Sequence, residues 1–208
     1  MATELGEYIV GAYLEEIRNC DVVYYNPSFV CPPEITGRKS SVKCEIDVVG
    51  LSVRGGFEKI YICEVTTHLK GINVRQKAKA KPMEVIKNKL IAGLWYASSF
   101  FPWIEHVEFE VWCNYVPKGN KMNYLKSIQN DFLTYLSKYN KKKGDKCLTY
   151  KCGLVINEQY ADCLMKLFDK AKKDTSHSDN SFYRGLQVLQ QTLKRNKYIK
   201  YFNKEYTI

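Results

Sequence analysis

Two acidic residues of this chain, Asp47 and Glu64, lie inside short β-branched segments 17 positions apart, CEIDVVG and YICEVT. A carboxylate buried among apolar neighbours is costly unless a cation pairs with it. Two such carboxylates on adjacent strands repel each other unless a divalent cation neutralises both. The pair therefore predicts a cation site. Mg²⁺ suits it, with Mn²⁺ as an alternative, because Mg²⁺ binds one or two carboxylates together with waters and phosphate oxygens. The expected chemistry is metal-assisted hydrolysis of phosphodiester bonds.

Each carboxylate also has a structural explanation. Asp47 and Glu64 could instead form a buried salt bridge with Lys43 or Arg54. We favour the cation site, because both acids are enclosed by apolar neighbours. Nearby Glu45 is better explained as a solvent-facing residue of a half-exposed strand.

The elements that must position these residues follow from the periodicity of the sequence. On a strand over 42–51, Asp47 shares a face with Lys43, and on a strand over 58–66, Glu64 shares a face with Thr66. A glycine turn between the two strands would bring the acids together. The further expected elements are helices at 3–18, 82–100, 121–139, 157–173 and 181–196, strands at 20–26, 107–116 and 147–156, and loops at 27–41 and 138–146. This order indicates an α/β layer fold.

The order of elements and the acidic residues resemble the PD-(D/E)XK, or restriction-endonuclease-like, nuclease superfamily. Its core runs helix, three antiparallel strands, helix, strand. Its aspartate ends the second strand, where this chain has EIDVV with Asp47, and its (D/E)XK triplet lies on the third strand, where this chain has Glu64-Val65-Thr66. The segment GEYIV, with Glu7, is similar to the first helix of archaeal junction resolvases and Mrr-like restriction proteins. The resemblance covers about residues 5–116 in layout.

The resemblance implies that Asp47 and Glu64 bind the metal, with the backbone carbonyl of Val65 as a further ligand. It also implies that Glu7 holds a second metal or a water. Glu16 is a rival for this role. A solvated position at the edge of the helix explains Glu7 almost as well.

The chain departs from the family at Thr66, which stands where the triplet has its lysine. That lysine orients the attacking water and stabilises charge that develops on the phosphate. Either the positive charge has moved elsewhere or the fold binds nucleic acid without cutting it. We favour migration, because both carboxylates are retained. The candidates are Lys70, which we favour, and Lys43, Lys77 and Lys79.

The charge of the chain favours an anionic partner. It has 32 basic and 22 acidic residues, a net charge of +10. Seven basic residues and one acid lie between positions 70 and 89: Lys70, Arg75, Lys77, Lys79, Lys81, Lys87 and Lys89 against Glu84. A polyanion drawn to this segment would be led toward the carboxylates. We expect Lys70, Arg75, Lys77, Lys79 and Lys81 to contact DNA, with RNA left open, although a solvated helix face would explain the same charges.

Length and cysteine usage complete the expectations. The 208 residues suit a nuclease-like core at 1–118 and a C-terminal part at 119–208 for target recognition or dimerisation. No apolar run is long enough for a membrane span, and several of the eight cysteines lie in apolar runs, which favours a reducing cytoplasm.

The predicted function is a Mg²⁺-dependent DNA endonuclease, acting as a homodimer if it cuts both strands. The alternatives are a catalytically inactive nucleic-acid-binding module or an interaction subunit on the same fold.

Overall fold

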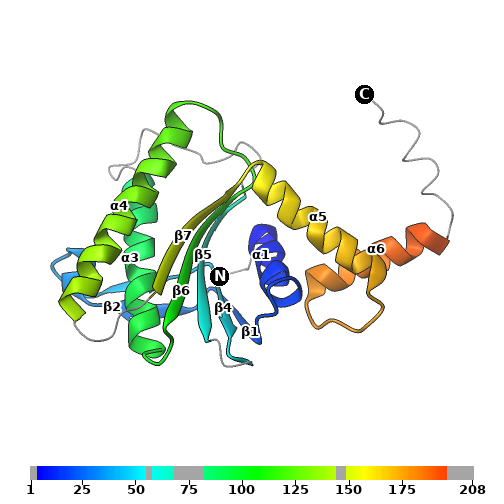
Figure 1. Ribbon diagram of the computed structural model, residues 1–208, viewed down its shortest axis with the longest axis horizontal. Coiled ribbons are helices and arrows are strands. Elements are labelled where there is room, and N and C mark those ends of the chain that lie inside the picture. The colour runs from blue at the N-terminus through cyan, green and yellow to red at the C-terminus, as the bar shows by residue number, and fades with distance from the viewer. Residues whose placement is uncertain (1–3, 55–57, 68–81, 144–148, 196–208) are drawn as a thin grey trace.

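A mixed five-stranded sheet forms the centre of the protein (Figure 1). The structure is a computed structural model and describes residues 4–54, 58–67, 82–143 and 149–195. The strands, in spatial order, are β1 (Val22–Tyr25), β4 (Val48–Ser52), β5 (Lys59–Thr66), β6 (His106–Cys113) and β7 (Thr149–Ile156). Strands β1, β4 and β5 are antiparallel, whereas β5, β6 and β7 are parallel. The sheet runs without a break from the first half of the chain into the second.

Helices cover both faces of this sheet (Figure 1). One face carries α1 (Leu5–Glu16), α5 (Glu158–Lys173) and α6 (Ser181–Arg195), and the other carries α3 (Pro82–Phe100) and α4 (Asn120–Lys143). A separate hairpin of β2 (Ser28–Cys31) and β3 (Val42–Glu45), with the short helix α2 (Pro33–Thr36) between its strands, packs against α3. No helix in the described part of the chain is long and apolar enough to cross a membrane.

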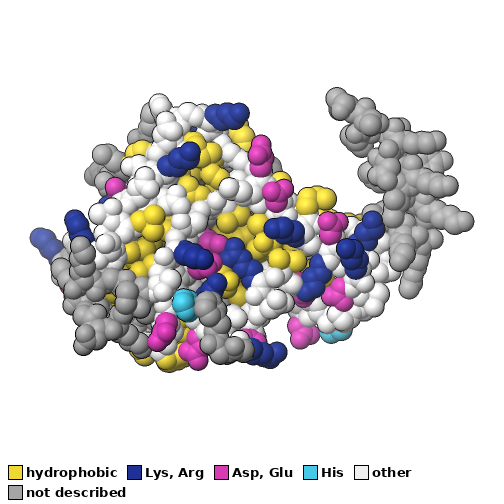
Figure 2. Space-filling model, in the orientation of Figure 1, with side chains coloured by type: hydrophobic (Ala, Val, Ile, Leu, Met, Phe, Trp, Pro, Cys, Tyr) yellow, Lys and Arg dark blue, Asp and Glu magenta, His cyan; other side chains and the backbone are white. Residues whose placement is uncertain are grey.

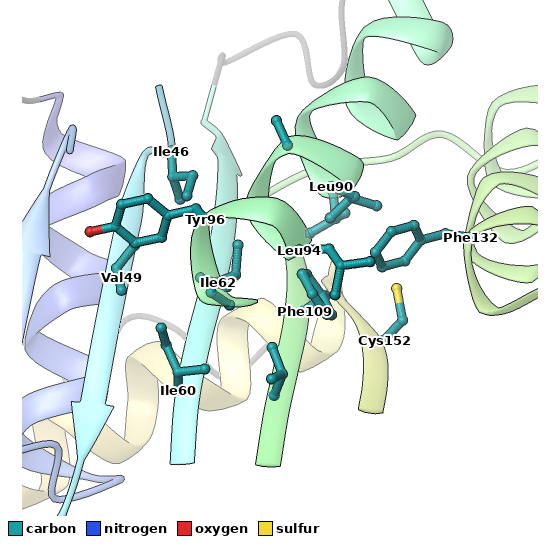
Figure 3. Packing of buried hydrophobic residues seen from close by; sticks show 14 of the residues in the cluster. Ile46, Val49, Ile60, Ile62, Leu90, Leu94, Tyr96, Phe109, Phe132 and Cys152 are labelled. Carbon is teal, nitrogen blue, oxygen red and sulfur yellow. The ribbon is translucent and has the colours of Figure 1, made fainter. Parts of the chain in front are cut away.

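Strand β5 is buried on both faces, which explains its nearly continuous apolar sequence. Ile60 and Ile62 point toward α3, whereas Tyr61 and Cys63 point toward α1. Figure 3 shows the α3 side, where Leu90 and Leu94 of the helix lie over the sheet residues Ile62 and Phe109. Glu64, two positions after Ile62, therefore faces α3 as well.

The close approach of α3 to β5 depends on Gly93. A Cβ atom at this position would lie 2.6 Å from Cγ2 of Ile62, a side chain with no exposed surface. Because Gly93 has no side chain, the backbone of α3 lies directly against β5. This close packing also sets how near to β5 the residues one helical turn before Gly93 lie.

The predicted helices and strands are largely confirmed, with three corrections. The strand expected over 42–51 is divided into β3 and β4, with Ile46 and Asp47 between them, because β3 pairs with β2 whereas β4 pairs with β1 and β5. The region expected to be a loop at 27–41 contains β2 and α2. The lysine-rich loop expected from residue 138 is helical as far as Lys143, at the end of α4.

We predict opposite effects for two glycine substitutions in helices. Gly93→Ala lowers the free energy of unfolding by about 1–3 kcal/mol, because the new methyl group forces α3 away from Ile62. Gly185→Ala, on α6 with open space around its Cα, raises it by about 0.5–1 kcal/mol through helix propensity. Urea denaturation of both variants checks this, and a Gly93→Ala protein as stable as the wild type would contradict it.

Candidate metal centre

Asp47 and Glu64 meet at the end of the β4–β5 ladder. Val48 pairs with Cys63 at the last rung of this ladder. Asp47 immediately precedes that rung and Glu64 immediately follows it, so the two acids lie opposite each other. Both are nearly buried, with side chains 13% and 5% exposed, respectively.

The ammonium group of Lys89, on α3, bridges the two carboxylates. Its Nζ lies 3.0 Å from Oδ1 of Asp47 and 2.5 Å from Oε2 of Glu64. The Lys89 side chain is 37% exposed, so the ion bridge is open to solvent on the side where this lysine lies. When both acids are ionised, the single positive charge of Lys89 leaves these three side chains with one net negative charge.

The remaining carboxylate oxygens differ in their environment. Oδ2 of Asp47 accepts a hydrogen bond from the backbone N–H of Val65 at 2.7 Å. Oε1 of Glu64 is buried and has no hydrogen-bond partner among the residues the structure describes. A buried carboxylate oxygen without a donor is unfavourable, so Glu64 has one oxygen available for a further cation or donor.

These surroundings change how the site titrates. Burial raises the pKa of Glu64 well above its ordinary value, and the charge of Asp47 adds to this, whereas Lys89 opposes it. Burial of Lys89 on its own lowers the pKa of the ammonium group, but the carboxylates of Glu64 and Asp47 outweigh this and raise that pKa. Lys89 therefore carries its charge at neutral pH.

Glu7 lies at the start of α1 and faces the same region. Its Oε2 accepts hydrogen bonds from Nδ2 of Asn26 at 2.8 Å and from the backbone N–H of Glu4 at 3.1 Å, the latter as part of a capping box. Burial raises the pKa of Glu7, and the charge of Asp47 raises it further against the effect of these hydrogen bonds. Asn26 also donates its backbone N–H to the carbonyl of Asp47 at 3.0 Å, which connects Glu7 to the site.

The start of α1 lies against the end of β5. A Cβ atom on Gly6 would overlap the side chain of Thr67, so glycine permits this contact. Thr66, the residue in place of the family's lysine, is half-buried at the end of β5. The five residues expected to contact DNA, Lys70, Arg75, Lys77, Lys79 and Lys81, lie outside the described residues.

The salt bridges of Asp47 and Glu64 with Lys43 or Arg54, expected as the structural alternative, are not formed. Lys43 is exposed on β3, and Arg54 forms an ion pair with Asp21 at 2.6 Å. The cation at the acids is Lys89, one of the seven basic residues between positions 70 and 89 and not one of the candidates expected at the site. The helical pattern could have identified it: Lys89 follows Ile86 by three positions and precedes Gly93 by four, so it lies on the apolar face of α3.

The site fits a divalent cation in its donor chemistry. Asp47 and Glu64 supply two carboxylates opposite each other, with the ammonium group of Lys89 between them, and Oε1 of Glu64 lacks a partner among the described residues. Within that same part of the chain, no group of three or more His, Cys, Asp or Glu side chains has the arrangement of a complete metal cage. Two carboxylates completed by waters and substrate phosphate are, however, the ligand set that Mg²⁺ prefers.

Comparisons of this chain with protein-family models, with curated proteins and with solved structures found no match.

We predict that Glu64 makes stability depend on pH. Its pKa lies above the ordinary value of 4.5, so the folded protein retains a proton that the unfolded chain has released. The free energy of unfolding therefore falls as the pH rises from about 4.5 through the raised pKa, by up to about 1.4 kcal/mol per pH unit. Urea denaturation across this range should show the fall in the wild type and a smaller fall in Glu64→Gln, in which Glu7 still has a raised pKa.

The exposed Glu105 provides the matched control. Glu105→Gln should keep the pH dependence of the wild type. If Glu64→Gln kept it as well, Glu64 would have the same pKa in the folded and unfolded states, and burial would not govern its titration.

Proposed function

We propose that this protein is a divalent-metal-dependent nuclease of the restriction-endonuclease-like type that hydrolyses phosphodiester bonds in DNA. The observation that carries the proposal is the bridging of Asp47 and Glu64 by Lys89. It places an aspartate, a glutamate and a lysine together, the three groups on which the PD-(D/E)XK motif depends. The lysine comes from the helix that packs on the third core strand, not from the strand itself.

The arrangement of elements supports the proposal. A helix, three antiparallel strands, a helix and a strand parallel to the third occur here as α1, β1–β4–β5, α3 and β6. This is the order that the resemblance implies for the nuclease core, with the hairpin of β2 and β3 inserted between its first two strands. Glu64 lies near the end of β5, the third core strand, as the resemblance implies, whereas Asp47 directly precedes the start of β4, the second core strand, and not its end.

In the proposed mechanism Asp47 and Glu64 would hold Mg²⁺, and the N–H of Val65 fixes the orientation of the Asp47 carboxylate. Bound Mg²⁺ would polarise the phosphate and lower the pKa of a water. Lys89 is charged at neutral pH and its side chain is long and partly exposed, so it can turn toward the phosphate and stabilise negative charge that develops there. Glu7, with its raised pKa, is placed to accept a proton from a water on the α1 side.

The net charge of +10 favours association with a polyanion. On the face shown in Figure 2, the Lys and Arg side chains of the described residues are scattered and interleaved with Asp and Glu, without a continuous basic patch. We expect DNA to approach along α3, where the Lys89 side chain is partly exposed.

One observation favours a second function, a nucleic-acid-binding module without activity. Thr66 has no charge, and Lys89 already satisfies one oxygen of each acid as a salt bridge would. Such a module would bind DNA in a salt-sensitive manner and be indifferent to Mg²⁺.

Cleavage assays separate these functions. We predict that the wild type cuts supercoiled plasmid or a four-way junction in Mg²⁺ or Mn²⁺ but not in EDTA, and that Lys89→Ala lowers the rate about 10²–10³-fold, as loss of an electrostatic donor does. Glu64→Gln should also be inactive. Lys87→Ala serves as the matched control, because Lys87 lies on the same helix but pairs with Asp131 at 3.5 Å; its rate should stay near that of the wild type. DNA binding without cleavage would support the binding module.

Thermal unfolding tests the cation site without activity. We predict that Ca²⁺ or Mg²⁺ raises the melting temperature of the wild type, because a ligand of the folded state stabilises it by mass action. The rise should be absent in the double variant Asp47→Asn/Glu64→Gln. It should be larger in Lys89→Ala, in which no ammonium group competes for the two carboxylates. An equal rise in the double variant would place the bound cation elsewhere.

A further inference from the structure

A pocket with a volume of about 300 Å³ lies directly beside the Lys89 site, between the β2–β3 hairpin and α3. Lys89 belongs to both places: it lines this pocket and bridges the two carboxylates. A ligand in the pocket would therefore lie next to the acids.

The wall that the hairpin contributes is held firmly against α3. The ring of Phe29, on β2, packs on Trp95 with centroids 5.8 Å apart and on Tyr96 with centroids 4.9 Å apart. Both aromatic residues lie on α3, on the helix that carries Lys89. The pocket is thus formed by two elements whose relative position is fixed by buried aromatic contacts.

The lining combines apolar, amide, basic and acidic groups. Cys44 and Val85 contribute apolar surface, Asn88 contributes an amide, and Arg38 and Lys43 contribute positive charge beside Lys89. The carboxylate of Glu45 also lines the pocket and can accept hydrogen bonds from amino groups. A flat apolar group with polar edges and an attached phosphate matches this combination.

We propose that the pocket binds one unpaired nucleotide of the DNA strand, adjacent to the phosphate that is cleaved. Its base would lie against Val85 and Cys44, and its phosphate would be bound by Arg38 and Lys43. This inference rests on the proposed function, in that it places the scissile phosphate at Lys89. It goes beyond that function by naming the form of the substrate.

The volume of the pocket limits which form of DNA can enter it. A volume near 300 Å³ is comparable to that of one base with its sugar and is small for a section of duplex. A base enters such a pocket only when it leaves the stack, which costs least in a single strand or at an unpaired position. The preferred substrate is therefore single-stranded DNA, or a duplex with an unpaired nucleotide at the cleavage point.

The test measures binding of fluorescently labelled single-stranded oligonucleotides in Ca²⁺, with an abasic site moved stepwise along the strand. Removing the base that occupies the pocket should weaken binding to the wild type about tenfold at one position, the effect of losing one base contact. In Val85→Trp, where the indole fills the pocket, intact and abasic strands should bind equally. Met165→Trp is the control, because Met165 is an exposed apolar residue on α5, and it should retain the abasic effect.

A second pair of variants tests the phosphate contacts. Arg38→Ala/Lys43→Ala should weaken binding of the intact strand at least tenfold, whereas Lys172→Ala/Lys173→Ala, exposed on α5, removes the same charge and should change it less than threefold. Where cleavage is measured, the first pair should raise KM more than it lowers kcat.

The outcomes separate this inference from the proposed function. An equal effect of abasic sites at all positions, or an unchanged abasic effect in Val85→Trp, would overturn the pocket even if the protein cleaves DNA. A position-specific abasic effect that Val85→Trp removes would support the pocket even if no metal-dependent cleavage is found.

Discussion

The ion bridge of Lys89 with Asp47 and Glu64 is the interaction on which the proposed site depends. Two carboxylates at the end of one strand ladder cannot both remain ionised and nearly buried without a cation between them. That cation comes from α3, so the site exists only while the helix lies close to β5. Gly93 permits this closeness, and the packing of Leu90 and Leu94 on the sheet maintains it.

A second buried carboxylate in the same sheet shows why Glu64 differs from a structural ion pair. Glu110, on β6, accepts a hydrogen bond from Arg18 at 2.7 Å on one oxygen and from Nε1 of Trp112 at 2.9 Å on the other. It lies on the opposite face of the sheet, and both of its oxygens have donors. Glu64 has one oxygen without a partner among the described residues and a partly exposed lysine as its counterion. Burial alone therefore does not make an acid a candidate ligand. Glu64 is one because one of its oxygens has no donor among the described residues and because solvent reaches its counterion.

Local periodicity was sufficient for most of the fold. The apolar run of β5 and the helical pattern of α3 are strong because each element packs on the sheet core along its whole length, and both were predicted almost to the residue. Strand β2 was missed because it has four residues and lies between Pro27 and Pro32, a pattern that resembles a loop. The break at Asp47 was missed because β3 and β4 pair with different sheets, a choice made between segments distant in the sequence.

The sequence by itself determined that Asp47 and Glu64 are the acids of the candidate site, because carboxylates inside apolar runs are unusual enough to stand out. It could not determine which lysine joins them. Lys70, the candidate favoured by its closeness to the strand along the chain, lies outside the described residues, whereas α3 brings Lys89, 25 residues after Glu64, to the acids. Only the tertiary structure decides this, because ion pairing depends on distance in space, and that distance is set by the packing of α3 on β5.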